Sequence, residues 1–204
     1  MLSRSHLAIA ALLITGVTAC SPTEQNAATS SPPTLPAFTT TSPTTSTSPK
    51  AAAADYRDLL LTAEDLTDTE DTFVERSREP SPDGHPGASA FFVNEQDTRA
   101  ISDTVLIYPD DDAATAALQQ AISTTKVAGN PRSAGIGQGG VLIRGTRPDE
   151  GKAVTLLLFA EGPALVRLEF QSAAGDATTD AFVTSIAKMQ QIALRVGLAD
   201  TGTS

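Results

Sequence analysis

Hydrophobic and polar residues follow the period of extended strands most clearly in the second half of the chain. Residues 165–171 alternate in type, which is typical of a strand. The apolar positions are Val166, Leu168 and Phe170, and the polar positions are Arg167, Glu169 and Gln171. Residues 154–159 form a nearly continuous apolar run, as expected of a central strand covered on both faces. Residues 141–144 predict a third strand. The sequence Glu161-Gly162-Pro163 predicts a turn between the strand at residues 154–159 and the strand at residues 165–171.

The first half of the folded region predicts three more strands. They cover residues 72–77, 89–93 and 103–108, with a Pro/Asp/Gly-rich loop at residues 80–87 between the first two. Ahead of them, residues 55–66 predict one or two short helices. Thr62 is a suitable N-cap there, because Glu64 and Asp65 follow in the first turn.

Two longer amphipathic helices complete the pattern. The first opens at Asp110-Asp111-Asp112 and runs to about Thr124; its apolar face carries Ala114, Leu118, Ala121 and Ile122. The second is predicted to be capped by Asp176 and to stop at Gly197. Its predicted buried stripe consists of Phe182, Ile186, Met189, Ala193 and Val196.

These elements predict one α+β domain over residues 55–198, with a disordered tail at residues 199–204. We expect an antiparallel sheet of about six strands with two main helices packed on it. Residues 112–118 and 176–182 share four identities when aligned, and each helix follows three strands. This indicates a duplicated strand-strand-strand-helix unit, although two Ala-rich helices with Asp caps can also resemble each other by chance.

The first 19 residues have the features of an export signal. Arg4 precedes an apolar run at residues 7–16 that is too short to span the hydrocarbon layer, which takes about 20 residues. The run is followed by Val17-Thr18-Ala19-Cys20, and Cys20 is the only cysteine of the chain. The four residues resemble a bacterial lipobox, which implies cleavage before Cys20 and attachment of the protein to a membrane through lipid on that thiol. An ordinary secretory signal is the alternative.

Residues 20–54 are predicted to be a disordered tether that starts at the lipidated cysteine. Of residues 21–54, 21 are Ser, Thr or Pro, and such a segment buries too little apolar surface to fold. A lipobox, a Thr/Pro-rich spacer and an acidic, lysine-poor domain together resemble the secreted lipoproteins of mycobacteria and related actinobacteria. The strand arrangement over residues 140–170 is similar to extracytoplasmic sensor-like lipoprotein domains of that group. The resemblance implies a cell-envelope location, lipid-anchored on the outer face of the membrane.

The charge balance excludes one class of partner. The chain has 24 acidic and 14 basic residues and a formal net charge of −10. Such a surface repels phosphate backbones, so we expect no nucleic acid partner, and membrane contact through the lipid alone.

Two features that could carry chemistry have local structural explanations. Residues 135–140 match a G-x-G-x-x-G string, but a dinucleotide site needs that string after a strand and before a helix. Here it precedes a predicted strand and is interpreted as a loop. His85 is the only histidine after the signal, and its Asp-Gly-His-Pro-Gly setting indicates an exposed turn. We therefore predict no catalytic residue and no cofactor.

The carboxylates are also interpreted as structural. Residues 55–83 hold ten acidic residues, and calcium could bind among Glu64, Asp65, Asp68, Glu70 and Asp71. No D-x-[DN]-x-[DN]-G spacing is present, however. With one histidine and a lipidated cysteine as the only soft ligands, we predict no metal site.

The leading hypothesis is a non-enzymatic binding or protein-interaction domain, monomeric and displayed on a tether, with an unknown envelope protein or apolar small molecule as partner. One alternative is a carrier of an apolar envelope ligand, because Phe91-Phe92, residues 156–158 and the apolar side of residues 165–171 could line a pocket instead of filling the core. The other is an envelope hydrolase that uses His85 or the acidic residues.

Overall fold

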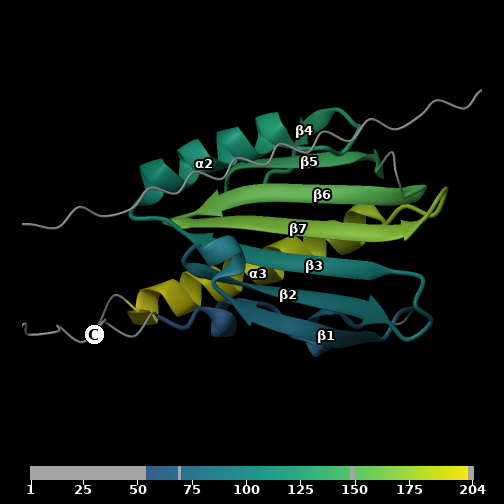
Figure 1. The fold of residues 1–204 in the computed structure, drawn as a ribbon, viewed down its shortest axis with the longest axis horizontal. Coiled ribbons are helices and arrows are strands. Elements are labelled where there is room, and N and C mark those ends of the chain that lie inside the picture. Colours follow the sequence, from purple (N-terminus) through teal and green to yellow (C-terminus); the bar gives the residue numbers. More distant parts are fainter. Residues whose placement is uncertain (1–53, 69, 148–149, 202–204) are drawn as a thin grey trace, which may run out of the picture. The chain divides into compact units, whose positions relative to one another are not determined.

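The computed structural model describes residues 54–68, 70–147 and 150–201, and these residues fold as a seven-stranded antiparallel sheet with helices on both faces (Figure 1). The strand order is β1-β2-β3-β7-β6-β5-β4. The strands are β1 (Phe73–Pro80), β2 (Gly87–Asn94), β3 (Ala100–Ile107), β4 (Pro131–Ser133), β5 (Gln138–Arg147), β6 (Lys152–Glu161) and β7 (Ala164–Ala173). The predicted export signal, Cys20 and almost all of the tether lie outside the described residues.

The α+β class and the antiparallel sheet are confirmed. Each of the six predicted strands is present, extended by a few residues, and β4 is a seventh, short strand at the edge next to β5. The two halves of the sheet join where β3 pairs with β7, with Val105 opposite Val166. In β6 the residues from 153 to 160 are all buried, as predicted for a strand covered on both sides.

Side chains alternate between two separate hydrophobic clusters, one on each face of the sheet. Leu157 and Phe159 of β6 belong to the cluster that packs against the long C-terminal helix α3 (Asp180–Thr201). Leu156 and Leu158 belong to the cluster that packs against α2 (Asp111–Thr124). We call these two sides the α3 face and the α2 face; Figure 1 shows α3 behind the strands.

The strand order has the symmetry that a duplicated unit would give, because β1-β2-β3 is followed across the sheet by β7-β6-β5. The helices do not share that symmetry. A twofold axis that relates two antiparallel neighbours such as β3 and β7 is perpendicular to the sheet and leaves both helices on one face. Since α2 and α3 lie on opposite faces, the duplication is not supported for the strand-strand-strand-helix unit as a whole.

The short helices and α2 begin where the sequence predicts. Thr62 caps α1 (Ala63–Leu66) in a capping box with Asp65, in which each side chain accepts a hydrogen bond from the other residue's backbone N–H. The side chain of Asp110 caps α2 by accepting the backbone N–H of Ala113 at 2.8 Å. Two short 3₁₀ helices, η1 (Arg57–Leu59) and η2 (Pro82–Gly84), complete the described elements.

The predicted ends of α3 are wrong. Asp176 does not cap the helix, because its carboxylate pairs with Arg99 at 2.6 Å, and α3 begins four residues later at Asp180. Gly197 does not end the helix either, since α3 continues to Thr201, and residues 199–201 therefore belong to the helix and not to the predicted disordered tail. This glycine lies against Leu59, and a Cβ atom at position 197 would be 2.3 Å from a methyl carbon of that leucine. The glycine therefore allows close packing of α3 on the N-terminal segment.

The buried stripe of α3 is rotated from the predicted one. Its fully buried members are Val183, Ile186, Ala187, Gln190 and Leu194. Of the predicted stripe only Ile186 is fully buried, and Val196 is 60% exposed. The helix turns this way because it packs on η1 as well as on the sheet, and Gln190 donates a 2.7 Å hydrogen bond to the carbonyl of Leu59.

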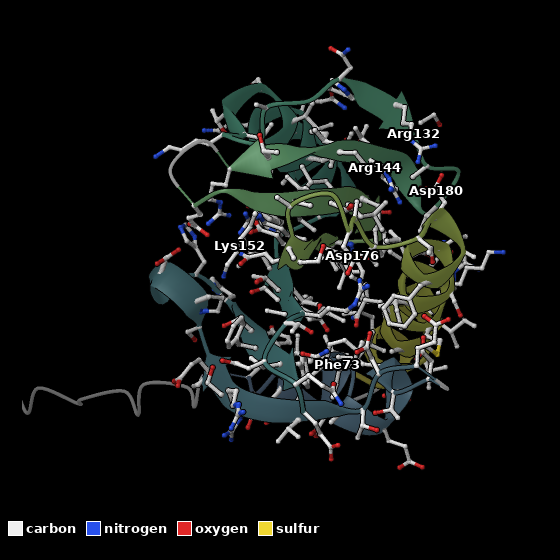
Figure 2. The ribbon with its side chains drawn as sticks, turned by 90° about the vertical axis from the view of Figure 1, so that its right-hand side faces the viewer. Phe73, Arg132, Arg144, Lys152, Asp176 and Asp180 are labelled. Atoms are coloured by element: carbon white, nitrogen blue, oxygen red, sulfur yellow. The ribbon has the colours of Figure 1, made fainter. Side chains whose placement is uncertain are left out.

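The start of α3 is attached to the sheet by charged side chains. Figure 2 shows Arg132 of β4 and Arg144 of β5 pointing toward Asp180, and each pairs with its carboxylate at 2.6 Å. The hydrogen bond from Arg132 is the main reason that the pKa of Asp180 lies below its ordinary value. None of the helices among the described residues is long and apolar enough to cross a membrane.

Candidate functional site

The α2 face of the sheet is only partly covered. Helix α2 packs on β5, β6 and β7. On the β1-β2-β3 half of the same face, Phe91 remains 37% exposed and Val74 40% exposed, because no described helix lies over them. Phe91 was predicted to belong to the core with Phe92, and only Phe92 does.

A cavity of about 730 Å³ lies where α2 ends over this face. Its floor is formed by Leu156 and Leu158 of β6. One wall comes from the last turn of α2 and the residues that follow it, and the other from strand side chains. The wall residues are Ala121, Thr124, Thr125, Lys126, Val127, Arg147 and Arg167. We call this hollow the α2 cavity; it opens to solvent, since Thr124, Lys126 and Arg167 are exposed.

A buried carboxylate holds the two arginines of the α2 cavity in place. Glu169 of β7 is 3% exposed and pairs with both Arg147 and Arg167. Gln171 donates a further hydrogen bond to Glu169 at 2.8 Å. The sequence correctly predicts that Arg167, Glu169 and Gln171 share one side of β7. It does not indicate that Glu169 is buried, because that depends on Arg147 reaching it from β5, two strands away.

The local charge of the α2 cavity is positive in a protein that is acidic as a whole. Arg147 and Arg167 share one buried carboxylate, and only Arg147 has a second partner, Glu150 at 3.3 Å. Lys126 makes no ion pair with any residue that the structure describes. Each guanidinium has five N–H donors, so donors of Arg167 in particular remain available to a ligand.

A second hollow of about 400 Å³ lies on the uncovered half of the same face, toward the β2–β3 turn. It is lined by Phe91, Val93, Ala100, Gln171 and Lys152 among others. Gln171 lines this hollow and also bonds to Glu169, whose two arginine partners line the α2 cavity. Figure 2 labels Lys152 on the side of the sheet away from α3.

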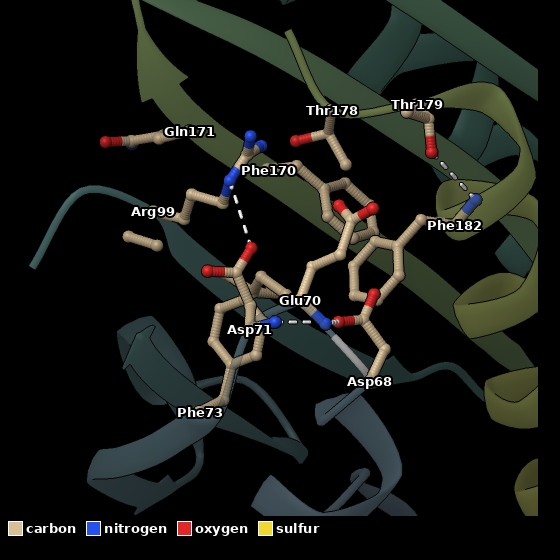
Figure 3. Close-up of a pocket in the computed structure, with 12 residues that line it drawn as sticks. Asp68, Glu70, Asp71, Phe73, Arg99, Phe170, Gln171, Thr178, Thr179 and Phe182 are labelled. Carbon is tan, nitrogen blue, oxygen red and sulfur yellow. Dashed lines mark hydrogen bonds and ion pairs between the residues drawn. The ribbon is translucent and has the colours of Figure 1, made fainter. Parts of the chain in front are cut away.

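Of the residues considered for calcium, Asp68, Glu70 and Asp71 lie around a much smaller hollow of about 50 Å³ on the α3 side (Figure 3), whereas Glu64 and Asp65 do not line it. Asp68 accepts the backbone N–H groups of Glu70 and Asp71, each at 2.8 Å. The carboxylate of Asp71 pairs with Arg99 at 3.0 Å. These carboxylates are thus engaged with the chain itself. In the described part of the chain, no group of three or more His, Cys, Asp or Glu side chains could hold a metal ion.

Phe73, Phe170 and Phe182 close the bottom of that small hollow (Figure 3). The rings of Phe73 and Phe182 are stacked 6.3 Å apart, and Phe170 meets Phe182 edge to face at 6.1 Å. Such contacts add roughly 0.5–1.5 kcal/mol each beyond area burial. We interpret this hollow as the end of the core, because it is too small for anything beyond a few water molecules.

The other sequence motifs are structural in this fold. His85 is exposed in the turn after η2 and does not line the α2 cavity. The Gly135–Gly140 string opens no helix, as predicted, but its last three residues belong to β5 and not to a loop before the strand. Its Gly137 adopts a φ of 55° and lies against β6, where a Cβ would be 2.5 Å from the carbonyl oxygen of Ala160.

One further ionisable group was not identified from the sequence. Asp103 of β3 is completely buried on the α3 side, where burial raises its pKa from 3.8 to about 7. One of its oxygens accepts the backbone N–H of Leu61 at 3.1 Å. Asp103 lies in the interior, on the opposite face from the α2 cavity, so its role belongs to the fold.

Comparison with known proteins does not assign the chain to a family. No family model and no curated protein matches the sequence. Among solved structures, the extracellular domain of PknH from Mycobacterium tuberculosis has a TM-score of 0.41 to this chain and 12% sequence identity, over 69% of this chain and 100% of that chain.

Proposed function

We propose that this protein is a lipid-anchored component of the cell envelope and that its domain binds a small ligand in the α2 cavity without transforming it. Cys20 carries the anchor in this proposal, and residues 21–54 form the tether that separates the domain from the membrane. The observation that carries the binding function is the α2 cavity, whose charged walls stand over an apolar floor.

The dimensions and lining of the α2 cavity support a ligand site. Pockets for small molecules typically have volumes of about 300–1,000 Å³ and combine an apolar surface with a few placed polar groups. The α2 cavity, at about 730 Å³, has Leu156 and Leu158 below and Arg147 and Arg167 at the wall. The two arginines are positioned in advance by Glu169, which lowers the entropy cost of binding.

The side chains at the α2 cavity favour recognition over catalysis. Its lining consists of Arg, Lys, Thr, Leu, Ala and Val residues. Arginine and lysine at neutral pH hold their protons and recognise anions, whereas general acid–base chemistry needs a group that titrates near the working pH. The buried carboxylate beside the cavity, Glu169, is engaged by two guanidiniums, and Glu150 pairs with Arg147.

The test compares the small molecules that remain bound to matched variants of the full-length protein. Each variant is purified from its own membranes, and its bound molecules are then extracted with organic solvent. Thr124→Trp places a large ring at the mouth of the α2 cavity, while Gln120→Trp places the same ring one turn earlier on α2, outside the cavity lining. We expect wild type and Gln120→Trp to retain one molecule per chain that Thr124→Trp lacks, measured by mass spectrometry.

Two results would contradict this function. One is the same extract from all three proteins, which would show that nothing occupies the α2 cavity. The other is hydrolysis of an ester or glycan panel that disappears in His85→Ala, which would support the hydrolase alternative.

A further inference from the structure

The geometry points to an anionic amphiphile as the ligand of the α2 cavity: a carboxylate or phosphate head bound by Arg147 and Arg167, with an apolar tail over Leu156 and Leu158. This inference rests on the proposed function and deepens it by naming the chemical class of the ligand. It follows from the positions of three cations, one buried carboxylate and the floor of the cavity.

The chemical class of the ligand's head group is inferred from the N–H donors of Arg147 and Arg167 that Glu169 leaves unused. The Nη2 atoms of Arg147 and Arg167 both bond to this carboxylate, from β5 and from β7. Glu169 thereby fixes both guanidinium groups on the same side of the sheet. Arginine binds carboxylates and phosphates through paired N–H groups, so the unused donors of the two fixed guanidiniums form a site for a planar or tetrahedral anion.

The charge distribution supports the same class. Three of the 14 Lys and Arg residues line this one cavity in a chain of net charge −10. The carboxylates that pair with these cations are Glu169 and Glu150. A local positive charge in an acidic protein attracts anions selectively, and the effect weakens as salt is added.

The position of the ligand's apolar tail is inferred from the floor of the α2 cavity and from the C-terminal end of α2. Leu156 and Leu158 lie beneath the cavity but are each 1% exposed, and Val127 is 6% exposed. The apolar surface open to a tail is therefore mainly that of the partly exposed Ala121 and of the aliphatic stems of Arg147, Arg167 and Lys126. The C-terminal end of a helix carries a partial negative charge, so an anionic head is disfavoured beside Thr124 and is placed at the strand side instead. The tail then lies toward the last turn of α2, with Lys126 offsetting the helix charge at the rim.

The experiment measures binding to the whole mature chain, residues 20–204, with Cys20→Ala to remove the predicted lipid. The probes are decanoate, decyl phosphate, decyl glucoside and inorganic phosphate, and isothermal titration gives each dissociation constant below the micelle concentration. We expect both anionic amphiphiles to bind about tenfold or more tightly than decyl glucoside and than phosphate alone. The ratio of decanoate to decyl phosphate affinity then identifies the head group.

Charge-removing variants locate the site. Arg167→Gln is expected to weaken binding of the anionic probes about tenfold. Lys126→Gln is expected to weaken it about threefold and removes an exposed side chain without an ion pair among the described residues, so it leaves the fold intact. Lys188→Gln on the opposite face is the matched control, with no change in affinity.

The outcomes separate this inference from the function on which it rests. If decyl glucoside binds as tightly as decyl phosphate and neither Arg167→Gln nor Lys126→Gln changes the affinity, the ligand class is wrong. If none of the four probes binds, the class is also wrong. In both cases a molecule retained by wild type and lost in Thr124→Trp still supports binding in the α2 cavity, whereas its absence overturns the proposed function.

Discussion

Asp103 is fully buried beneath the segment that joins η1 to α1. Its Oδ2 accepts the backbone N–H of Leu61, while its Oδ1 has no hydrogen-bond partner among the described residues. Arg78 also reaches this segment and donates to the carbonyl of Leu61 at 2.8 Å. Burial is the main reason that the pKa of Asp103 is about 7, because removing a carboxylate from water disfavours its charged form.

We predict that Asp103 makes the protein less stable as the pH rises from about 4 to about 7. In that window the folded state holds a proton on Asp103 that the unfolded state, with a pKa near 3.8, has lost. The slope is at most about 1.4 kcal/mol per pH unit, and above about pH 7 it disappears. Urea unfolding of wild type and Asp103→Asn at pH 5 and pH 7 measures it.

The expected result of that comparison is a stability advantage of wild type over Asp103→Asn that shrinks by about 2 kcal/mol from pH 5 to pH 7. Asp112→Asn, on the exposed side of α2, is the control that should show no such change. A constant difference between wild type and Asp103→Asn at the two pH values would contradict a raised pKa.

Glu169 shows what a pattern of single residues can and cannot predict. The alternation along residues 165–171 correctly separates its side of β7 from the side of Leu168. An alternating charged side is usually solvated, and here it is buried because Arg147 and Arg167 neutralise it under the rim of the α2 cavity. The signal that was missed is the arginine at the far end of β5, which local sequence does not connect with Glu169.

At the scale of elements, local signals predicted most of the structure. Strand periodicity and the caps at Thr62 and Asp110 depend on neighbouring residues, so the strands, α1 and α2 were placed correctly. The errors concern α3, whose start and end depend on distant partners such as Arg99 for Asp176 and Leu59 for Gly197. The short strand β4 was missed because three exposed residues give no periodic pattern.

The segment after α2 is predicted to depend on a glycine of β5. A Cβ atom at position 145 would lie 2.0 Å from the carbonyl oxygen of Ala128, a contact that only a shift of the backbone can relieve. Gly145→Ala is therefore expected to destabilise the protein by about 1–3 kcal/mol and to displace Val127 at the wall of the α2 cavity. Urea unfolding measures the stability.

Thr146→Ala is the matched control for this glycine, because Thr146 is exposed beside it, and we expect a change of less than about 0.5 kcal/mol. Gly145→Ala should also weaken binding of decyl phosphate. Equal stabilities of Gly145→Ala and Thr146→Ala would show that the strand and the following segment are not as close as described.

At the scale of the whole molecule, the sequence predicted the fold class. Of the apolar residues that it offered as a pocket lining, Leu156 and Leu158 border the α2 cavity, whereas Leu157, Leu168 and Phe170 belong to the core on the α3 face. Opposite placement of α2 and α3 leaves half of the α2 face without a helix, and the cavity forms at that boundary. Neither helix has a sequence feature that selects a face, because both are amphipathic and Ala-rich. The cavity therefore follows from the tertiary arrangement alone.

The proposed lipid anchor on Cys20 leads to a prediction about membrane attachment. A lipid on Cys20 is expected to hold the protein on membranes stably, since each buried methylene contributes about 0.8 kcal/mol and two or more acyl chains suffice. Cys20→Ala should move the protein from the membrane fraction to the soluble fraction in cell fractionation. A Cys20→Ala protein that still sediments with membranes would contradict the anchor, and Ser21→Ala is the control that should remain bound.

The claim that the α2 cavity is the binding site is tested most directly by mapping a ligand on the mature chain by amide chemical shifts. On titration with decyl phosphate, we predict that the amides of Thr124 to Val127, Arg147 and Arg167 shift together with one dissociation constant. The amides of α3, on the opposite face, should stay unchanged. Shifts confined to α3 or to the aromatic hollow at Phe182, with none at Arg167, would contradict the account.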